Sequence, residues 1–309
     1  MEPTPTITSM APVLAGALVH SHAGEILQGA VRRSDGIHRL LFSLPAPTLW
    51  SRAELLATPG QTLAVNPPWA KKTLFAIRLL LSRLGRPEPE AMIHLTTNIP
   101  VAKGCGSSTA DILAGLRAIL AYLHIRLSEE VLARLIVEAE KASDGSILSR
   151  PAIFRHREGE VDRYLPGAIP DVHVVVIDAQ PNEIVPTEPM QRARYSEEQL
   201  ATFDVLIARL NHAFRLGNPS DFGAVATASA RISQDFLAKP HLEKIIALVQ
   251  REGGFGVAVA HSGTVISAIL PPQCPGETLA RIQDAIGELG MEIVTEFDLG
   301  ITAHQEVAA

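Results

Sequence analysis

Apolar residues follow two different spacings in the first half of the chain, and each spacing predicts a different kind of element. Aliphatic and β-branched runs bounded by Gly or Pro are typical of strands, since such side chains suit a half-buried pleated surface. Apolar residues three and four positions apart are typical of amphipathic helices. Strands are therefore expected at residues 13–19, 40–44, 48–57 and 91–97, and helices at 69–84, 107–123 and 128–142.

The second half of the chain places long helical patterns between short apolar runs. Strands are expected at residues 152–155, 161–165, 172–178, 257–260, 264–270 and 291–297, and helices at 196–216, 220–236, 241–252 and 276–289. The segment 181–189 contains three prolines and is expected to be a connection. Helices on one face of an antiparallel sheet would give an α+β arrangement. A boundary near Gly167–Pro170 would divide the chain into domains at 1–168 and 169–309.

Composition narrows the class of protein. The chain has 309 residues, of which 47% are apolar and 19% charged, and its formal net charge of −6 contains no basic block. This argues against nucleic acid or a membrane surface as a partner, and the longest apolar runs fall far short of the roughly 20 residues that a membrane span needs. Two cysteines, Cys105 and Cys274, cannot build a disulfide framework, so we expect a reducing, cytoplasmic location.

The clearest chemical signal is the segment 99–111, in which small residues precede the helix expected at 107–123. Because Gly104 and Gly106 have no Cβ, backbone N–H groups near them can approach an anion closely. The start of the helix adds unpaired N–H donors and the positive end of the helix dipole. Hydroxyl groups that can donate to phosphate oxygens or bind Mg²⁺ are those of Ser107, Ser108 and Thr109.

A glycine-containing turn capped by Ser107 is a simpler interpretation of this segment, and two glycines alone would favour it. Three adjacent hydroxyl residues before an apolar helix favour phosphate binding instead. The segment is not a Walker A loop, because no Gly-Lys-Ser/Thr follows at the required spacing. Cys105 is interpreted as a small residue that fills the loop, since no companion motif supports a Cys–His nucleophile.

The segment resembles the ATP loop of the GHMP small-molecule kinases, which has the form Pro-x-x-x-Gly-x-Gly-Ser-Ser-x-Ala. The residues that match it are Pro100, Gly104, Gly106, Ser107, Ser108 and Ala110. The resemblance implies MgATP as phosphate donor and a two-domain α+β fold, with a ribosomal S5 domain 2-like N-terminal domain and a ferredoxin-like C-terminal domain. The implied ATP-binding residues are Pro100, Lys103, Gly104, Cys105, Gly106, Ser107, Ser108 and Thr109.

Within this family the chain looks most like the L-threonine kinases of cobalamin side-chain synthesis. Three segments carry the likeness: 24–29, 107–111 and 259–263. The acceptor-binding residues that it implies are Glu25, Gln28, His261, Ser262 and Gly263. The residues alone favour a turn with a solvated Glu25 for the first segment, and for the third they leave a plain hairpin open. His20 and His22 are interpreted as ordinary polar histidines, because a third or fourth metal ligand at fitting spacing is absent.

Asp144 is the predicted general base. By resemblance to the family, it lies in the loop that follows the helix after the phosphate segment. An Asp beside the acceptor hydroxyl would accept its proton as the bond to the γ-phosphoryl group forms. The plain alternative is a turn Asp before Gly145, which is a frequent use of Asp-Gly.

The metal site is predicted to combine Ser108 with one carboxylate, Glu138 or Glu140. These two glutamates lie about 200° apart on a helical wheel, so we expect only one to face the site. In the L-threonine kinases we expect a Glu three residues before the catalytic Asp, whereas this chain has Lys141 there. Lys141 could instead reach a carboxylate or phosphate of the substrate.

The resemblance therefore predicts a monomeric or homodimeric ATP-dependent kinase that converts L-threonine, a small hydroxyl acceptor, to O-phospho-L-threonine. Another amino acid, or a metabolite of a specialised pathway, stays open as acceptor because of Lys141. A catalytically silent nucleotide or metabolite sensor on the same fold is the alternative of another class. An unrelated α+β protein with a generic anion-binding loop is the last alternative.

Overall fold

The computed structural model describes residues 11–183 and 193–300. Its strands are β1 (Val13–Arg33), β2 (Gly36–Ala57), β3 (Ala64–Asn66), β4 (Ala91–Thr97), β5 (Ala152–Arg155), β6 (Glu160–Tyr164), β7 (Val172–Asp178), β8 (Gly256–Val259), β9 (Val265–Leu270) and β10 (Glu292–Leu299). Its helices are α1 (Lys71–Arg83), α2 (Ser107–Leu123), α3 (Glu129–Glu140), α4 (Glu197–Leu216), α5 (Pro219–Ser233), α6 (Leu242–Arg251) and α7 (Gly276–Glu288), with a 3₁₀ turn at Gly145–Ile147.

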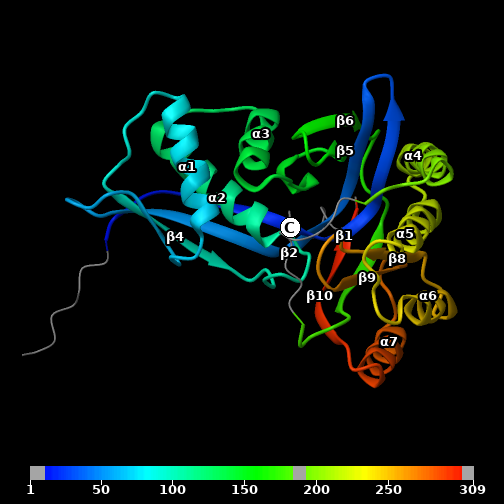
Figure 1. Ribbon diagram of the computed structural model, residues 1–309. Helices are drawn as coiled ribbons and strands as arrows, with labels where there is room; N and C mark the ends of the chain where they lie inside the picture. Colours follow the sequence, from blue (N-terminus) through cyan, green and yellow to red (C-terminus); the bar gives the residue numbers. More distant parts are fainter. Residues whose placement is uncertain (1–10, 184–192, 301–309) are drawn as a thin grey trace, which may run out of the picture.

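The described strands form one sheet in the order β10-β7-β9-β8-β1-β2-β4-β3, with β5 paired to β2 and β6 to β5. Figure 1 shows helices α1 to α3 gathered beside the strands of the first half, and α4 to α7 in a row beside the strands of the second half. The predicted α+β class is confirmed. The domain boundary expected at 168/169 lies in the connection between β6 and β7 and stays a prediction.

The predicted helices are present, and their ends follow local chemistry. The helix expected at 107–123 has these bounds as α2. Helix α3 begins after Ser128, whose hydroxyl accepts from the Val131 N–H, and α4 begins with a capping box between Ser196 and Gln199. No helix in the described part of the chain is long and apolar enough to cross a membrane.

The first two strands differ most from the prediction. The strand expected at 13–19 continues to Arg33 as β1 and includes the segment 24–29, where the residues alone favoured a turn. The separate strands expected at 40–44 and 48–57 are parts of β2. The pairing of β1 with β2 shifts register between His20 and Ser21, and again between His22 and Glu25. Polar residues at such irregularities break the alternation that indicates a strand, which explains the error.

Strand β1 is buried on both sides beyond His20, since residues 21–31 are all buried. Helix α2 packs on this part of β1, and so do α4 and α5 from the second half of the chain. Buried polar groups must find partners within the protein. Strand β1 therefore carries its polar side chains into the region where the two halves of the chain meet.

Candidate active site

A cavity of about 680 Å³ lies between the start of α2, the end of α3, strand β1 and the turn before β9. It brings together residues that are far apart in the sequence. Those that line it include His22, Glu25, Lys72, Gly104, Gly106, Ser107, Ser108, Thr109, Glu140, Lys141, Asp144, His156, Arg157, His261 and Ser262. A cavity of this size is large enough for a small-molecule ligand.

The glycines of the phosphate segment are required by backbone conformation and by close packing. Gly104 and Gly106 have φ values of +87° and +69°, in the region that favours glycine. A Cβ at Gly104 would collide with the carbonyl oxygen of Ser262, and one at Gly106 would lie 2.6 Å from the His22 ring and 2.9 Å from Asp144 Oδ2. The segment thus passes tightly between the β8–β9 turn and the Asp144 loop.

Helix α2 presents N–H groups and hydroxyls to the cavity. No side chain of the described residues caps its first turn, which leaves those N–H groups directed at the cavity. Ser108 Oγ donates to Glu140 Oε2 at 2.6 Å, and Thr109 Oγ1 donates to Glu140 Oε1 at 2.7 Å. Burial raises the pKa of Glu140 to about 7, although these two hydroxyl donors act in the opposite direction. A carboxylate and two hydroxyls therefore meet beside the helix terminus.

His22 lies between two buried carboxylates. Its Nε2 is 3.5 Å from Asp144 Oδ2, and its Nδ1 is 3.6 Å from Glu25 Oε1. Burial by itself lowers the pKa of His22, but the charges of Asp144 and Glu25 outweigh it and raise the pKa to about 9. Burial raises the pKa of Asp144, yet the charge and hydrogen bond of His22 outweigh burial and lower it overall. At neutral pH the pair is an imidazolium and a carboxylate.

Gly24 is the reason that His22 and Glu25 face the same site. In a regular strand, residues three apart point to opposite faces of the sheet. Gly24 has a φ of +78°, and the register of β1 shifts beside it, so the two side chains turn toward each other. A Cβ at Gly24 would lie 2.9 Å from the backbone of Val259. Burial raises the pKa of Glu25 to about 7, and its Oε2 has no partner among the described residues.

The turn between β8 and β9 contacts the phosphate segment through the backbone. The N–H groups of Thr264 and Val265 both donate to the carbonyl oxygen of Lys103, at 3.0 and 3.1 Å. Of the three turn residues predicted to bind the acceptor, His261 and Ser262 line the cavity, whereas Gly263 does not. The Gly263 carbonyl oxygen instead accepts a hydrogen bond from Lys239 Nζ at 2.8 Å.

Three residues of the predicted ATP-binding set do not line the cavity: Pro100, Lys103 and Cys105. Lys103 Nζ pairs with Asp178 Oδ2 at 2.8 Å and donates to three backbone carbonyl oxygens of the segment 180–183. Cys105 is buried, its pKa is raised to about 12 by burial, and its carbonyl oxygen accepts from Ser21 Oγ. The side chain of Lys103 therefore contacts the second half of the chain and that of Cys105 is buried, and the ATP-binding role of the three residues stays a prediction.

Two further predicted residues also point elsewhere. Glu138 pairs with Arg83 on α1 at 2.5 Å, so of the two glutamates on α3 it is Glu140 that lies at the cavity. Gln28 is buried, and its Nε2 donates to the Val259 carbonyl oxygen at 3.0 Å. Its Oε1 lies 3.1 Å from His261 Nδ1, in a smaller neighbouring cavity.

Two histidines and one arginine that line the cavity were not predicted from the sequence. His22 was interpreted as an ordinary polar residue, and His156 and Arg157 were not considered. His22 and Glu25 are three residues apart, a spacing that gives no signal in a strand. The partner of His22, Asp144, lies in a distant part of the chain, so no local pattern could have revealed the pair.

The fold and the cavity define a class of protein. The model of the GHMP kinases N-terminal domain matches residues 70–151, and the model of the GHMP kinases C-terminal domain matches residues 210–289. The chain belongs to the GHMP kinases and is an ATP-dependent small-molecule kinase.

The chain is also similar to several individual proteins. The chain is 28% identical to an L-threonine kinase of Citrobacter freundii, over 83% of this chain and 86% of that protein. It is 29% identical to an L-threonine kinase of Salmonella typhimurium, over 89% of this chain and 88% of that protein. A solved homoserine kinase from Cytophaga hutchinsonii superposes with a TM-score of 0.68 at 15% identity, covering 97% of this chain and 98% of that structure. The structural match supports the two-domain GHMP kinase fold.

Proposed function

We propose that this kinase transfers the γ-phosphoryl group of ATP to the side-chain hydroxyl of L-threonine and releases O-phospho-L-threonine. The observation that carries the proposal is the meeting, in one cavity, of the glycine–hydroxyl loop and the buried carboxylate of Asp144. Similarity to two L-threonine kinases over most of the chain supports the choice of acceptor.

The phosphates would bind at the start of α2. Backbone N–H groups of residues 104–109 would bind them, in a loop that only glycine permits at two positions. The helix dipole adds partial positive charge at the same place. The chain's own contribution is to hold these donors fixed before the nucleotide arrives, so that little reorganisation is needed during the reaction.

Ser108 and Glu140 would hold Mg²⁺, which supplies neutralising charge between the phosphates when bound. The fit rests on donor chemistry, since a half-buried carboxylate beside two hydroxyls offers the oxygen ligands that Mg²⁺ prefers. No three His, Cys, Asp or Glu side chains of the described residues cluster as a metal site. This suits a metal that takes one or two protein ligands and completes its coordination with phosphate and water.

Asp144 would orient the acceptor hydroxyl and take its proton. Its lowered pKa keeps it ionised at neutral pH, and the Ser146 N–H holds its Oδ1 at 2.9 Å. A carboxylate with a low pKa is a weak base, but a loose phosphoryl-transfer transition state demands little proton removal before the bond forms. Positioning of the hydroxyl is therefore the main contribution of Asp144.

Glu25 would bind the ammonium group of the amino acid. Its carboxyl is buried, and its Oε2 has no partner among the described residues. A buried acceptor of this kind costs free energy until a donor reaches it. An ammonium group would supply both the donor and the opposite charge, and would lower the pKa of Glu25 from about 7.

A kinase for a different small acceptor is the second candidate. Lys141 stands at the cavity in left-handed conformation with a φ of +72°, at the position where resemblance to the L-threonine kinases leads us to expect Glu. An extra cation there favours an acceptor with an additional anionic group.

Both cysteines are free, which agrees with the reducing compartment that we propose for the protein.

The test is ADP release from MgATP with a panel of hydroxy amino acids, homoserine, mevalonate and simple sugars, followed by the mass of the product. We expect turnover with L-threonine and a product of the mass of O-phosphothreonine. Turnover with a different acceptor alone would contradict the assignment of L-threonine. ATP binding without turnover of any acceptor would instead favour a sensor.

The substitution Asp144→Asn, measured in the same assay, tests the catalytic role of Asp144. We expect kcat to fall by about 10²- to 10⁴-fold, because general base and orientation are lost together, with a small change in ATP binding. Asp204→Asn, at an exposed position on α4, is the control and should leave kcat unchanged. An unchanged kcat in Asp144→Asn would remove this residue from the mechanism.

A further inference from the structure

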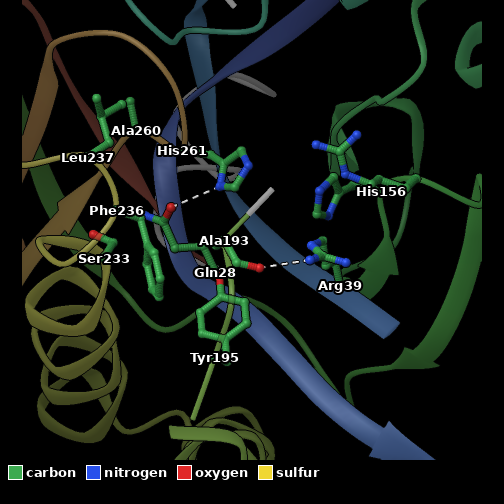
Figure 2. Close-up of a pocket in the computed structure, with 11 residues that line it drawn as sticks. Gln28, Arg39, His156, Ala193, Tyr195, Ser233, Phe236, Leu237, Ala260 and His261 are labelled. Atoms are coloured by element: carbon green, nitrogen blue, oxygen red, sulfur yellow. Dashed lines mark hydrogen bonds between the residues drawn. The ribbon is translucent and has the colours of Figure 1, made fainter. Parts of the chain in front are cut away.

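A second, smaller cavity of about 50 Å³ adjoins the large one. His156, Arg157 and His261 line both cavities, so these side chains form a shared wall. Figure 2 shows Arg39 and His156 together on one side of the smaller cavity, across from Ser233 and Phe236. The function proposed above uses neither His156 nor the two arginines.

His156 is the most informative residue of this wall. It is 2% exposed, and neither of its ring nitrogens has a hydrogen-bond partner among the described residues. Buried polar groups are nearly always hydrogen-bonded, so two unpartnered nitrogens indicate a missing ligand atom. The His156 carbonyl oxygen accepts from the Ser143 N–H at 2.9 Å, which holds the His156 backbone beside the Asp144 loop.

Arginine side chains make the wall positive. Arg39 donates from its terminal nitrogen to the Ala193 carbonyl oxygen at 2.7 Å, and its Nε has no partner among the described residues. After burial, Arg157 and Arg39 are among the causes that lower the pKa of both His156 and His261, and for His261 the value is about 4. Both rings are therefore neutral at neutral pH. The N–H of His261 is directed at Gln28 Oε1, whereas His156 offers one N–H donor next to a guanidinium.

The large cavity is lined by groups of both signs. Glu25, Asp144 and Glu140 supply carboxylates, and Arg157 and the His156 ring line the same cavity next to the smaller one. A ligand that matches this pattern has a hydroxyl or cationic end and an anionic end. Arginine binds carboxylates with paired, directional N–H donors, which fixes orientation as well as affinity.

We propose that Arg39, His156 and Arg157 bind the carboxylate of the phosphoryl acceptor and so restrict the kinase to hydroxy acids. The inference rests on the proposed function in that the acceptor occupies this cavity with its hydroxyl at Asp144, but it does not depend on threonine being the acceptor. A neutral analogue would lose the attraction between its carboxylate and the two guanidinium groups, and a site built to bind a charged group in this way rejects that analogue strongly.

The experiment compares L-threonine with L-threoninamide, which keeps the hydroxyl and the ammonium group but lacks the carboxylate. We expect the wild-type kinase to prefer the acid in kcat/KM by about 10²-fold or more. In Arg39→Met and in Arg157→Met, the KM for L-threonine should rise roughly 10- to 100-fold while the KM for ATP stays the same. The preference for acid over amide should shrink by the same factor.

Arg52→Met is the matched control, since Arg52 is an exposed arginine on the same strand as Arg39 and should change neither constant. Arg39→Lys keeps the charge and should retain part of the preference, while melting temperatures confirm that each variant is folded. Equal use of acid and amide by the wild type would overturn the inference, and so would a rise in KM confined to ATP. If a different hydroxy acid is the acceptor, that acid is compared with its own amide. A preference for the acid that depends on the two arginines would then support the inference, although the assignment of L-threonine as acceptor would be wrong.

Discussion

At the scale of single residues, the site depends on buried charges that compensate one another. His22 has a pKa of about 9 because Asp144 and Glu25 outweigh the effect of burial, and Asp144 is kept ionised chiefly by His22. Removing one member of such a group leaves a buried charge without its partner, which costs more than the interaction itself is worth. The imidazolium of His22 therefore holds the carboxylate of Asp144 ready for the acceptor.

The raised pKa of His22 predicts a pH dependence of stability. A histidine whose pKa rises from 6.5 to about 9 on folding stabilises the native state fully below about pH 6.5, and this contribution is lost as pH rises to about 9. The free energy of unfolding should fall across that window by on the order of 3 kcal/mol. Denaturant titrations at a series of pH values measure it.

His22→Gln should lack most of this fall, because no titrating group stands at that position. His20→Gln is the control, since His20 is an exposed histidine two residues away on the same strand. It should keep the pH dependence of the wild type. An equal fall in His22→Gln and in the wild type would show that the ion pair with Asp144 does not form in solution.

The two glutamates on α3 provide a matched pair of substitutions. Glu140→Gln removes the carboxylate at Ser108 and Thr109, so we expect the Mg²⁺ concentration for half-maximal activity to rise by roughly 10- to 100-fold. Glu138→Gln should leave the Mg²⁺ dependence unchanged, because Glu138 faces Arg83 instead. Kinase activity against Mg²⁺ at saturating ATP measures both. The same response from both variants would argue against Glu140 as the metal ligand.

At the scale of elements, the phosphate segment depends on glycine in left-handed conformation. Gly106→Ala would place a methyl group against His22 and Asp144 and would add the backbone cost of a left-handed alanine, about 1–2 kcal/mol. We expect this variant to lose most of the ATP-induced rise in melting temperature. Gly60→Ala carries a similar backbone cost at φ +79° with no atom within 4 Å of the new Cβ. It should bind ATP normally, and equal ATP responses of the two variants would contradict the role of Gly106.

Elements with a clean periodic pattern were predictable, and α2 matches its prediction at both ends. Strand β1 was not, because its buried half carries Ser21, His22 and Glu25 in place of an alternating pattern. Helices from both halves of the chain bury these residues. Ser21 and His22 find partners in distant segments, at Cys105 and Asp144, and His22 also pairs with Glu25. A local sequence pattern cannot show these contacts, because they come from distant parts of the chain.

At the scale of the whole molecule, Lys103 connects the two halves of the chain. Its ammonium group pairs with Asp178 at the end of β7 and donates to backbone carbonyl oxygens of the segment 180–183. The Lys103 carbonyl oxygen accepts from the start of β9. The loop that faces the cavity is thereby fixed to the second half of the chain.

Lys103→Met should destabilise the fold by about 3–5 kcal/mol, because it leaves Asp178 buried without its partner. Arg231→Met breaks the exposed pair between Arg231 and Glu243 and should cost no more than about 1 kcal/mol. Unfolding by denaturant compares the two. Similar small losses in both variants would show that Lys103 does not tie the halves together.

From the sequence, the fold and the site could be predicted only where they follow from the resemblance to the GHMP kinases. The loop motif implied the GHMP kinase fold and placed Asp144 and Glu140 among the candidates. It could not indicate that Lys103 points away from the cavity, or that His156 and Arg157 line it. Lys103 is held by contacts with the second half of the chain, and His156 and Arg157 directly follow β5, which pairs with β2. No local pattern specifies either arrangement.

A crystal structure of the kinase with Mg²⁺, a non-hydrolysable ATP analogue and L-threonine would test phosphoryl transfer in this cavity most directly. We predict the γ-phosphate at the N–H groups of residues 104–109, and the threonine hydroxyl within hydrogen-bond distance of Asp144 and in line with the γ-phosphorus. A nucleotide or an acceptor hydroxyl bound away from these groups would contradict the proposed mechanism.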